Sequence, residues 1–167
     1  MTRVLGIDPG SSATGYGVVE GDHGSFRLLE CGVVRPRPSG TFAERLLQIH
    51  EGVLSVIDQH QPDCLAIEGV FYRENARTAV ILSHARGVAL LAGALRGLPV
   101  LEYAPAEIKK SIVGTGRARK DQVGYMVQKL LGLAAAPSPA DAADGCAVAL
   151  CHLMTGTGPL AAARATL

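Results

Sequence analysis

Four carboxylates stand at the ends of apolar segments, where an unpaired charge is costly. Asp8 ends the first apolar run of the chain, and Glu68 ends the run CLAI. Asp141 and Asp144 lie three residues apart in PADAADGCAVAL, at the start of a predicted helix, so both project from one face of that helix. A buried carboxylate without a partner is unfavourable or takes up a proton, so each of the four needs a hydrogen-bond donor, a cation or a metal.

Each of these carboxylates also has a purely structural explanation. Asp8 precedes Pro-Gly and could be a turn residue, and Glu68 could pair with a nearby arginine. Asp141 or Asp144 could cap the free amides of a helix N-terminus, where acidic residues are favourable. One shared site explains all four together, provided that the strands ending at Asp8 and Glu68 are neighbours and that the last helix packs against the same edge.

A shared site of this kind predicts bound metal ions. Four carboxylates in one place repel one another strongly, and two Mg²⁺ ions would relieve that repulsion. Zinc is not indicated, because no His or Cys residues are patterned as its ligands. Two such ions about 4 Å apart can activate a water and stabilise the leaving oxygen in phosphodiester cleavage. These residue types therefore favour metal-dependent hydrolysis of a phosphodiester.

Positive charge gathers in two tracts, although the net charge is only +1. Residues 103–129 contain Lys109, Lys110, Arg117, Arg119, Lys120 and Lys129 against Glu107 and Asp121. Residues 71–96 contain Arg73, Arg77, Arg86 and Arg96 against Glu74. A local basic face of this kind can bind a polyanion, whereas two solvated helix faces would have the same composition.

The elements that must position these residues follow from periodicity and turn signals. Three short apolar segments joined by short connections predict an antiparallel meander, with a turn at 21–24. Thr41 and Glu44 have the spacing of a helix capping box. Alternating helices and apolar strands follow, which predicts an α/β fold with a five-stranded mixed sheet and helices on both faces. The expected strands are 4–7, 14–20, 26–34, 64–67 and 100–103, and the expected helices are 42–60, 75–96, 105–112, 120–131 and 140–154.

The length of 167 residues and the 48% of hydrophobic residues indicate one domain of ordinary size, here 1–155, with 156–167 expected to be a disordered tail. Cys31, Cys64, Cys146 and Cys151 form no C-x-x-C pair, so we expect thiols in or near the core. No signal peptide and no apolar run long enough to span a bilayer are visible, so we expect a soluble cytoplasmic protein.

The chain is similar to the RuvC family of bacterial Holliday-junction resolvases over about residues 3–154. The similarity rests on motifs in the same order and spacing as in that family: GIDPGSSATGYGVV, AIEGVFYRENARTA, HARGVALLA, PAEIKKSIVGTGRARKDQV and ADAADGCAVALCH. The resemblance implies a ribonuclease H-like fold, a homodimer, and cutting of two opposed strands of a four-way DNA junction in recombination and repair. It also implies 5′-phosphate and 3′-hydroxyl ends, two Mg²⁺ ions per subunit with Mn²⁺ able to substitute, and coupling to a branch-migration helicase.

The resemblance also implies roles for individual residues. The acids that bind metal in this family correspond to Asp8, Glu68, Asp141 and Asp144, and the lysines that assist catalysis and hold DNA correspond to Lys109 and Lys120. Phe71 corresponds to an aromatic residue that stacks on a base near the junction centre; core packing is the alternative. The expected DNA contacts are Phe71, Tyr72, Arg73, Asn75, Arg77, Arg86, Lys109, Lys110, Arg117, Arg119 and Lys120. The loop 114–116 could bring backbone amides to a phosphate or serve only as a connector.

Two positions depart from the family pattern. Gly69 stands where glutamine is usual, and Gly145-Cys146 stands where Ala-Leu is usual. Neither position supplies a predicted metal ligand. We expect Gly69 to loosen the loop that carries Phe71 or to change local sequence preference.

Two other functions fit part of the pattern. The first motif also resembles the first phosphate loop of actin-like ATPases and sugar kinases, but those need a second lobe and a second phosphate loop, which one domain of this length cannot supply. A junction-binding module without catalysis would keep the basic tracts but would need no cluster of acids.

Overall fold

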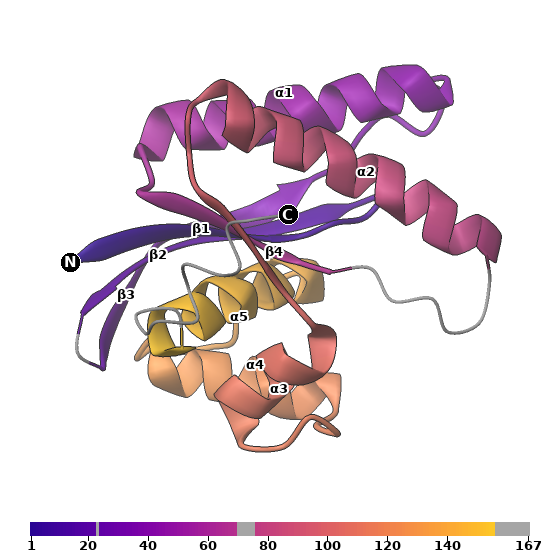
Figure 1. The fold of residues 1–167 in the computed structure, drawn as a ribbon. Coiled ribbons are helices and arrows are strands. Elements are labelled where there is room, and N and C mark those ends of the chain that lie inside the picture. The colour runs from indigo at the N-terminus through magenta and orange to yellow at the C-terminus, as the bar shows by residue number, and fades with distance from the viewer. Residues whose placement is uncertain (23, 70–75, 156–167) are drawn as a thin grey trace.

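The computed structural model describes the chain except residues 23, 70–75 and 156–167. A five-stranded sheet in the order β3-β2-β1-β4-β5 forms the middle layer, with α1 and α2 on one face and α3, α4 and α5 on the other (Figure 1). The strands are β1 (Thr2–Asp8), β2 (Thr14–Asp22), β3 (Ser25–Val34), β4 (Cys64–Glu68) and β5 (Val100–Tyr103). The helices are α1 (Phe42–His60), α2 (Ala76–Leu95), α3 (Pro105–Val113), α4 (Lys120–Leu130) and α5 (Ala140–Thr155).

The predicted element order and mixed sheet are confirmed. β1, β2 and β3 form the antiparallel meander, and β4 and β5 run parallel to β1. The predicted turn at 21–24 is wrong in part, because Gly21 and Asp22 continue β2 and pair with Phe26 and Ser25. The capping box of α1 is confirmed: Glu44 N–H donates to Thr41 Oγ1 at 3.2 Å, and Thr41 N–H donates to Glu44 Oε2 at 2.7 Å.

Along the central strands, alternate side chains point to opposite faces of the sheet, and this decides which of them face α5. In β1, Leu5 and Ile7 pack in the core under α1 and α2, whereas Val4 packs in the core under α5. Asp8 has the parity of Val4, so it lies on the α5 face. Parallel pairing of Ile7 with Ile67 brings Glu68 level with Asp8 on the same face. Both strand ends therefore present a carboxylate to α5.

Glycines allow α5 to lie directly on the sheet. A Cβ at Gly15 would overlap the backbone of Asp141, and a Cβ at Gly6 would overlap the backbone of α5 at Gly145 and Ala149. On the helix side, a Cβ at Gly145 would lie 2.5 Å from the Cα of Tyr16, closer than any real contact. This close packing of backbones brings the first turns of α5, with their two aspartates, down to the strand ends.

The four cysteines are free thiols, and three of them are buried: Cys64, Cys146 and Cys151. Cys31 is half-buried and packs against the same core as Cys146. The expectation of core or near-core thiols is confirmed.

Helix α2 is long and apolar enough, by length and composition alone, to cross a membrane. The expectation that no apolar segment has this length was therefore wrong. Ala85, Ala89 and Ala92 on one side of α2 have no exposed surface, and the last two pack in the core with α1 and the sheet. The other side of the helix is exposed.

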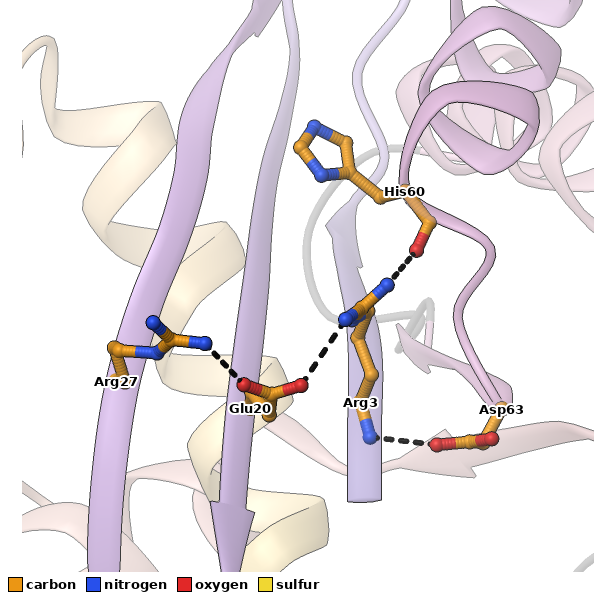
Figure 2. A network of polar contacts seen from close by, with 5 residues as sticks. All are labelled: Arg3, Glu20, Arg27, His60 and Asp63. Carbon is orange, nitrogen blue, oxygen red and sulfur yellow. Dashed lines mark hydrogen bonds and ion pairs between the residues drawn. The ribbon is translucent and has the colours of Figure 1, made fainter. Parts of the chain in front are cut away.

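A polar network closes the end of the sheet opposite to Asp8 (Figure 2). Glu20 of β2 accepts from Arg3 Nη2 at 3.1 Å and from Arg27 Nη2 at 2.6 Å, and these bonds lower the pKa of its carboxyl. Arg3 also donates to the carbonyl oxygen of His60, and its backbone N–H donates to Asp63 Oδ2 at 2.7 Å. The network links three strands to the end of α1 and the start of β4. It lies at the end of the sheet away from Asp8 and Glu68.

Candidate active site

A cleft of about 170 Å³ lies at the carboxyl ends of β1 and β4. It is lined by Asp8, Glu68, Pro105, Ile108, Lys109, Lys120, Val123, Asp144 and Ala147. Carboxylates and lysines thus share one hollow, with apolar side chains of α3, α4 and α5 as its walls. The predicted convergence of the strand ends and the last helix is present in the structure.

Three of the predicted metal ligands form a tight cluster. Carboxylate oxygens of Asp8, Asp141 and Asp144 all lie within 4.8 Å of one another. Glu68 lies outside this group of three but lines the same cleft as Asp8 and Asp144. The four carboxylates therefore belong to one site, with Glu68 on its β4 side.

Burial and mutual repulsion hold protons on the two strand-end carboxyls. Desolvation, with the negative charges of Glu68 and Asp144, raises the pKa of Asp8 to about 8. Desolvation, with the charge of Asp144, raises the pKa of Glu68 to about 7. Lys120 opposes both shifts, but its effect is smaller than that of burial. Without a further cation, this site cannot hold all its negative charge near neutral pH.

The two predicted lysines reach the cleft from different helices. Lys120, the first residue of α4, donates to Asp144 Oδ2 at 2.8 Å, and this bond raises the pKa of the lysine. Lys109 of α3 lines the cleft, and its positive charge favours ionisation of Glu68. The purely structural explanation for Asp144, that it caps the helix, is not what the structure shows, because its partner is a lysine.

The donor set fits Mg²⁺. All ligand atoms that the cluster offers are carboxylate oxygens, which Mg²⁺ prefers, and the described side chains that line the cleft include no imidazole or thiolate to favour zinc. The raised pKa values of Asp8 and Glu68 fit this, because the positive charge of the nearby lysines does not offset burial and the neighbouring carboxylates.

Apart from Lys109 and Lys120, which line the cleft, the predicted DNA contacts fall into three groups. Phe71, Tyr72, Arg73 and Asn75 lie outside the described residues. Lys110, Arg117 and Arg77 are exposed, on α3, on the loop before α4 and at the start of α2. Arg86 and Arg119 have carboxylate partners within the fold: Arg86 pairs with Glu102 of β5, and Arg119 Nη2 donates to Asp121 Oδ2 at 3.0 Å.

The structure also gives a role to Gly69 that its sequence context does not suggest. A Cβ at Gly69 would lie 2.5 Å from Oε1 of Glu102, the carboxylate that pairs with Arg86. A longer side chain at this position would therefore have to move Glu102.

The residues that the sequence did not indicate are this Glu102 and the apolar residues that line the cleft, Pro105, Ile108, Val123 and Ala147. Composition alone does not distinguish an apolar residue that lines a cleft from one in the core.

Comparisons with known proteins agree with this geometry. The family model described as crossover junction endodeoxyribonuclease RuvC matches residues 4–152. A crossover junction endodeoxyribonuclease RuvC from Halorhodospira halophila is 54% identical over 164 residues, 98% of this chain and 96% of the relative. The solved structure of Thermus thermophilus RuvC in complex with a Holliday junction substrate superposes with a TM-score of 0.87 at 37% identity, covering 92% of this chain and 94% of that one. The yeast mitochondrial Holliday junction resolvase Ydc2, at 13% identity and a TM-score of 0.63, shares the fold.

Proposed function

Because this chain belongs to the RuvC family of crossover junction endodeoxyribonucleases, we propose that it resolves four-way (Holliday) DNA junctions by hydrolysing one phosphodiester bond in each of two opposed strands. One observation carries this proposal: the carboxylates of Asp8, Asp141 and Asp144 gather beside Glu68 in a cleft that also holds two lysines. The proposal assigns the activity to residues 1–155. It replaces the two other functions considered from the sequence, the ATPase and the module without catalysis.

The carboxylates would hold divalent metal. Asp8, Asp141 and Asp144 offer oxygens close enough together to share an ion, and Glu68 on the β4 side, with Asp8, could hold a second. Mg²⁺ bound there, with Mn²⁺ as a substitute, would supply a water of lowered pKa and a positive charge for the leaving oxygen. Cleavage of the bond from phosphorus to the 3′ oxygen, with that oxygen taking up a proton, would leave 5′-phosphate and 3′-hydroxyl ends. The apolar walls of the cleft keep bulk water away from these groups and strengthen every charge interaction in it.

The lysines would position the scissile phosphate. Lys120 stands over Asp144, and its side chain is 74% exposed, so its ammonium group can contact a phosphate oxygen without leaving the carboxylate. Lys109 faces the same cleft from α3. The exposed Lys110 of α3 and Arg117 of the loop before α4 would contact the backbone of the junction arms.

Cutting of two opposed strands requires two sites, and α2 supplies a surface for a second copy. Val80, Leu91 and Leu95 are at least half exposed and lie on one side of α2. Burial of this row in a two-fold homodimer would remove apolar surface from water and place two clefts symmetrically. A branch-migration helicase, implied by the family resemblance, would be the further partner of such a dimer.

The proposal is tested with a synthetic mobile four-way junction. Wild-type protein with Mg²⁺ is expected to give paired nicks at symmetrical positions, and Asp8→Asn to bind the junction with unchanged affinity and not cut it. Equal cutting by both proteins would remove Asp8 from the site. Lack of cutting by wild type with either Mg²⁺ or Mn²⁺, at concentrations where it binds the junction, would contradict the proposed function.

A further inference from the structure

We propose that Thr14 is a positioning residue for the metal site. Its hydroxyl group holds the segment that runs from Asp8 to Gly15, and the backbone of Gly15 packs against that of Asp141. The inference rests on the proposed function. It concerns a side chain that has no exposed surface and does not line the cleft.

The Thr14 hydroxyl closes the loop that follows Asp8. Its Oγ1 donates to the carbonyl oxygen of Gly10 at 2.8 Å and accepts from the N–H of Gly10 at 3.3 Å. The buried Thr14 side chain thus satisfies both the N–H and the C=O group of Gly10. The strand before Gly10 ends at Asp8 and the strand after it begins at Thr14, so this pair of bonds fixes the shape of the connection.

The residue after Thr14 touches the other side of the metal site. Gly15 pairs with Asp8 across the two strands, and its backbone packs so closely on the backbone of Asp141 that a Cβ there would overlap it. Asp8 and Asp141 are both members of the cluster of carboxylate oxygens within 4.8 Å. The segment Thr14–Gly15 therefore lies between the end of β1, which carries Asp8, and the start of α5, which carries Asp141.

Asp8 depends on this backbone frame. In the part of the chain that the structure describes, burial and neighbouring charges, but no hydrogen bond, act on the Asp8 carboxyl. The position of its oxygens is therefore set by the end of β1 and by the loop that Thr14 closes. Loss of the hydroxyl would leave the partly buried N–H and C=O of Gly10 without this partner, and the loop would rearrange to satisfy them. A displacement of even about 1 Å at a metal ligand can lower a rate by about a hundredfold.

Three variants test this inference: Thr14→Val, which keeps the shape and removes the hydroxyl; Thr14→Ser, which keeps the hydroxyl; and Thr155→Val as a matched control. Thr155 Oγ1 donates to the carbonyl oxygen of Cys151 at 2.6 Å at the far end of α5, so its loss removes a similar bond away from the cleft. The readouts are junction binding without metal, Mn²⁺ binding to the DNA-free protein by calorimetry, and single-turnover cleavage over a range of Mg²⁺ concentrations.

We expect Thr14→Val to bind the junction as wild type does, to bind Mn²⁺ at least about fivefold more weakly, and to cleave at least about tenfold more slowly, with partial recovery at high Mg²⁺. Thr14→Ser and Thr155→Val should stay within about twofold of wild type in all three readouts. Wild-type Mn²⁺ affinity and rate in Thr14→Val would overturn the inference, as would a tenfold loss in Thr14→Ser.

Two further outcomes have a defined interpretation. If Thr14→Val does not fold, the Thr14→Ser result alone decides, because a hydroxyl-dependent position must tolerate serine. A wild-type protein that does not cut the junction at all contradicts the proposed function, whereas a cutting wild type with an equally active Thr14→Val contradicts only the role of Thr14.

Discussion

The Nζ atom of Lys120 lies 2.8 Å from Oδ2 of Asp144, which joins the start of α4 to α5 beside the carboxylate cluster. The two partners differ in their surroundings: the lysine side chain is 74% exposed and that of Asp144 only 19%. The ion pair therefore stands at the mouth of the cleft, with the lysine on the solvent side. Under the proposed function, a phosphate that enters from solvent would meet this ammonium group before it meets the carboxylates.

Lys120→Ala is therefore expected to impair chemistry far more than folding. Removal of a cation that contacts the phosphate should slow single-turnover cleavage by about 10- to 100-fold. The free energy of unfolding should change by less than about 1 kcal/mol, because the lysine side chain is 74% exposed. Lys129→Ala, at an exposed lysine near the other end of α4, is the matched control and should cut at the wild-type rate. An unchanged rate in Lys120→Ala would remove this lysine from the site.

Asp8→Asn should stabilise the metal-free protein while it abolishes cleavage. At pH 8 without metal, wild type must either ionise a buried carboxyl next to other negative charges or keep a proton on it, and the amide avoids both. A gain of about 1–2 kcal/mol would raise the melting temperature by about 2–8 °C. Asp121→Asn is the control with the opposite sign, since the pKa of that exposed carboxyl is lowered by Arg119. A lower melting temperature for Asp8→Asn would show that Asp8 is stabilised in the metal-free fold.

The same carboxyls predict how stability depends on pH. The pKa of Asp8 is raised from 3.8 to about 8 and that of Glu68 from 4.5 to about 7, so between these limits the folded state binds more protons than the unfolded chain. Their contribution to the free energy of unfolding therefore falls as the pH rises from about 4 to about 8. In EDTA the melting temperature should fall over this range more steeply for wild type than for Asp8→Asn. Saturating Mg²⁺, which binds the ionised form, should remove most of the difference at pH 8; equal slopes in EDTA would contradict the assignment.

The parts of the site that the sequence predicted are those that depend on local pattern. Apolar runs ending in Asp8 and Glu68 and the spacing of Asp141 and Asp144 are visible in one dimension, and the parity of strands then places them on one face. The pairing of Arg86 with Glu102 was not predictable, because it joins α2 to β5 and both residues are charged like many on the surface. The expected DNA contact of Arg86 stays a prediction, to which the structure adds this carboxylate partner.

The limits of the strands were harder to predict than their order. Gly21 and Asp22 have turn composition, but pairing with Phe26 and Ser25 keeps them in β2, so tertiary pairing overrides local preference there.

The close approach of α5 to the sheet could not be predicted from the sequence either. Glycines in a strand signal some close neighbour, and only the fold shows that the neighbour of Gly15 is the backbone of Asp141.

Gly145→Ala tests whether this close approach positions the aspartates. The added methyl group would lie 2.5 Å from backbone atoms of Tyr16, so α5 must move away from β2. We expect a loss of about 1–3 kcal/mol in the free energy of unfolding and at least about tenfold in cleavage rate. Gly124→Ala in α4, where nothing lies within 4 Å of the new methyl group, should instead stabilise by up to about 1 kcal/mol. Similar stability changes in the two variants would contradict the packing argument.

Leu91→Glu tests the role of α2 in assembly. Leu91 is 51% exposed and Val80 and Leu95 lie on the same side of the helix, so a charge there should disrupt a dimer that buries this row without disturbing the monomer core. We expect a monomer by sedimentation at concentrations where wild type is a dimer, and single nicks in place of paired nicks in a supercoiled plasmid that carries a junction. Tyr125→Ser, at a 56% exposed side chain of α4 on the opposite face of the sheet, should leave the dimer and the paired nicks intact (Figure 1). A dimeric Leu91→Glu protein with paired nicks would place the interface elsewhere.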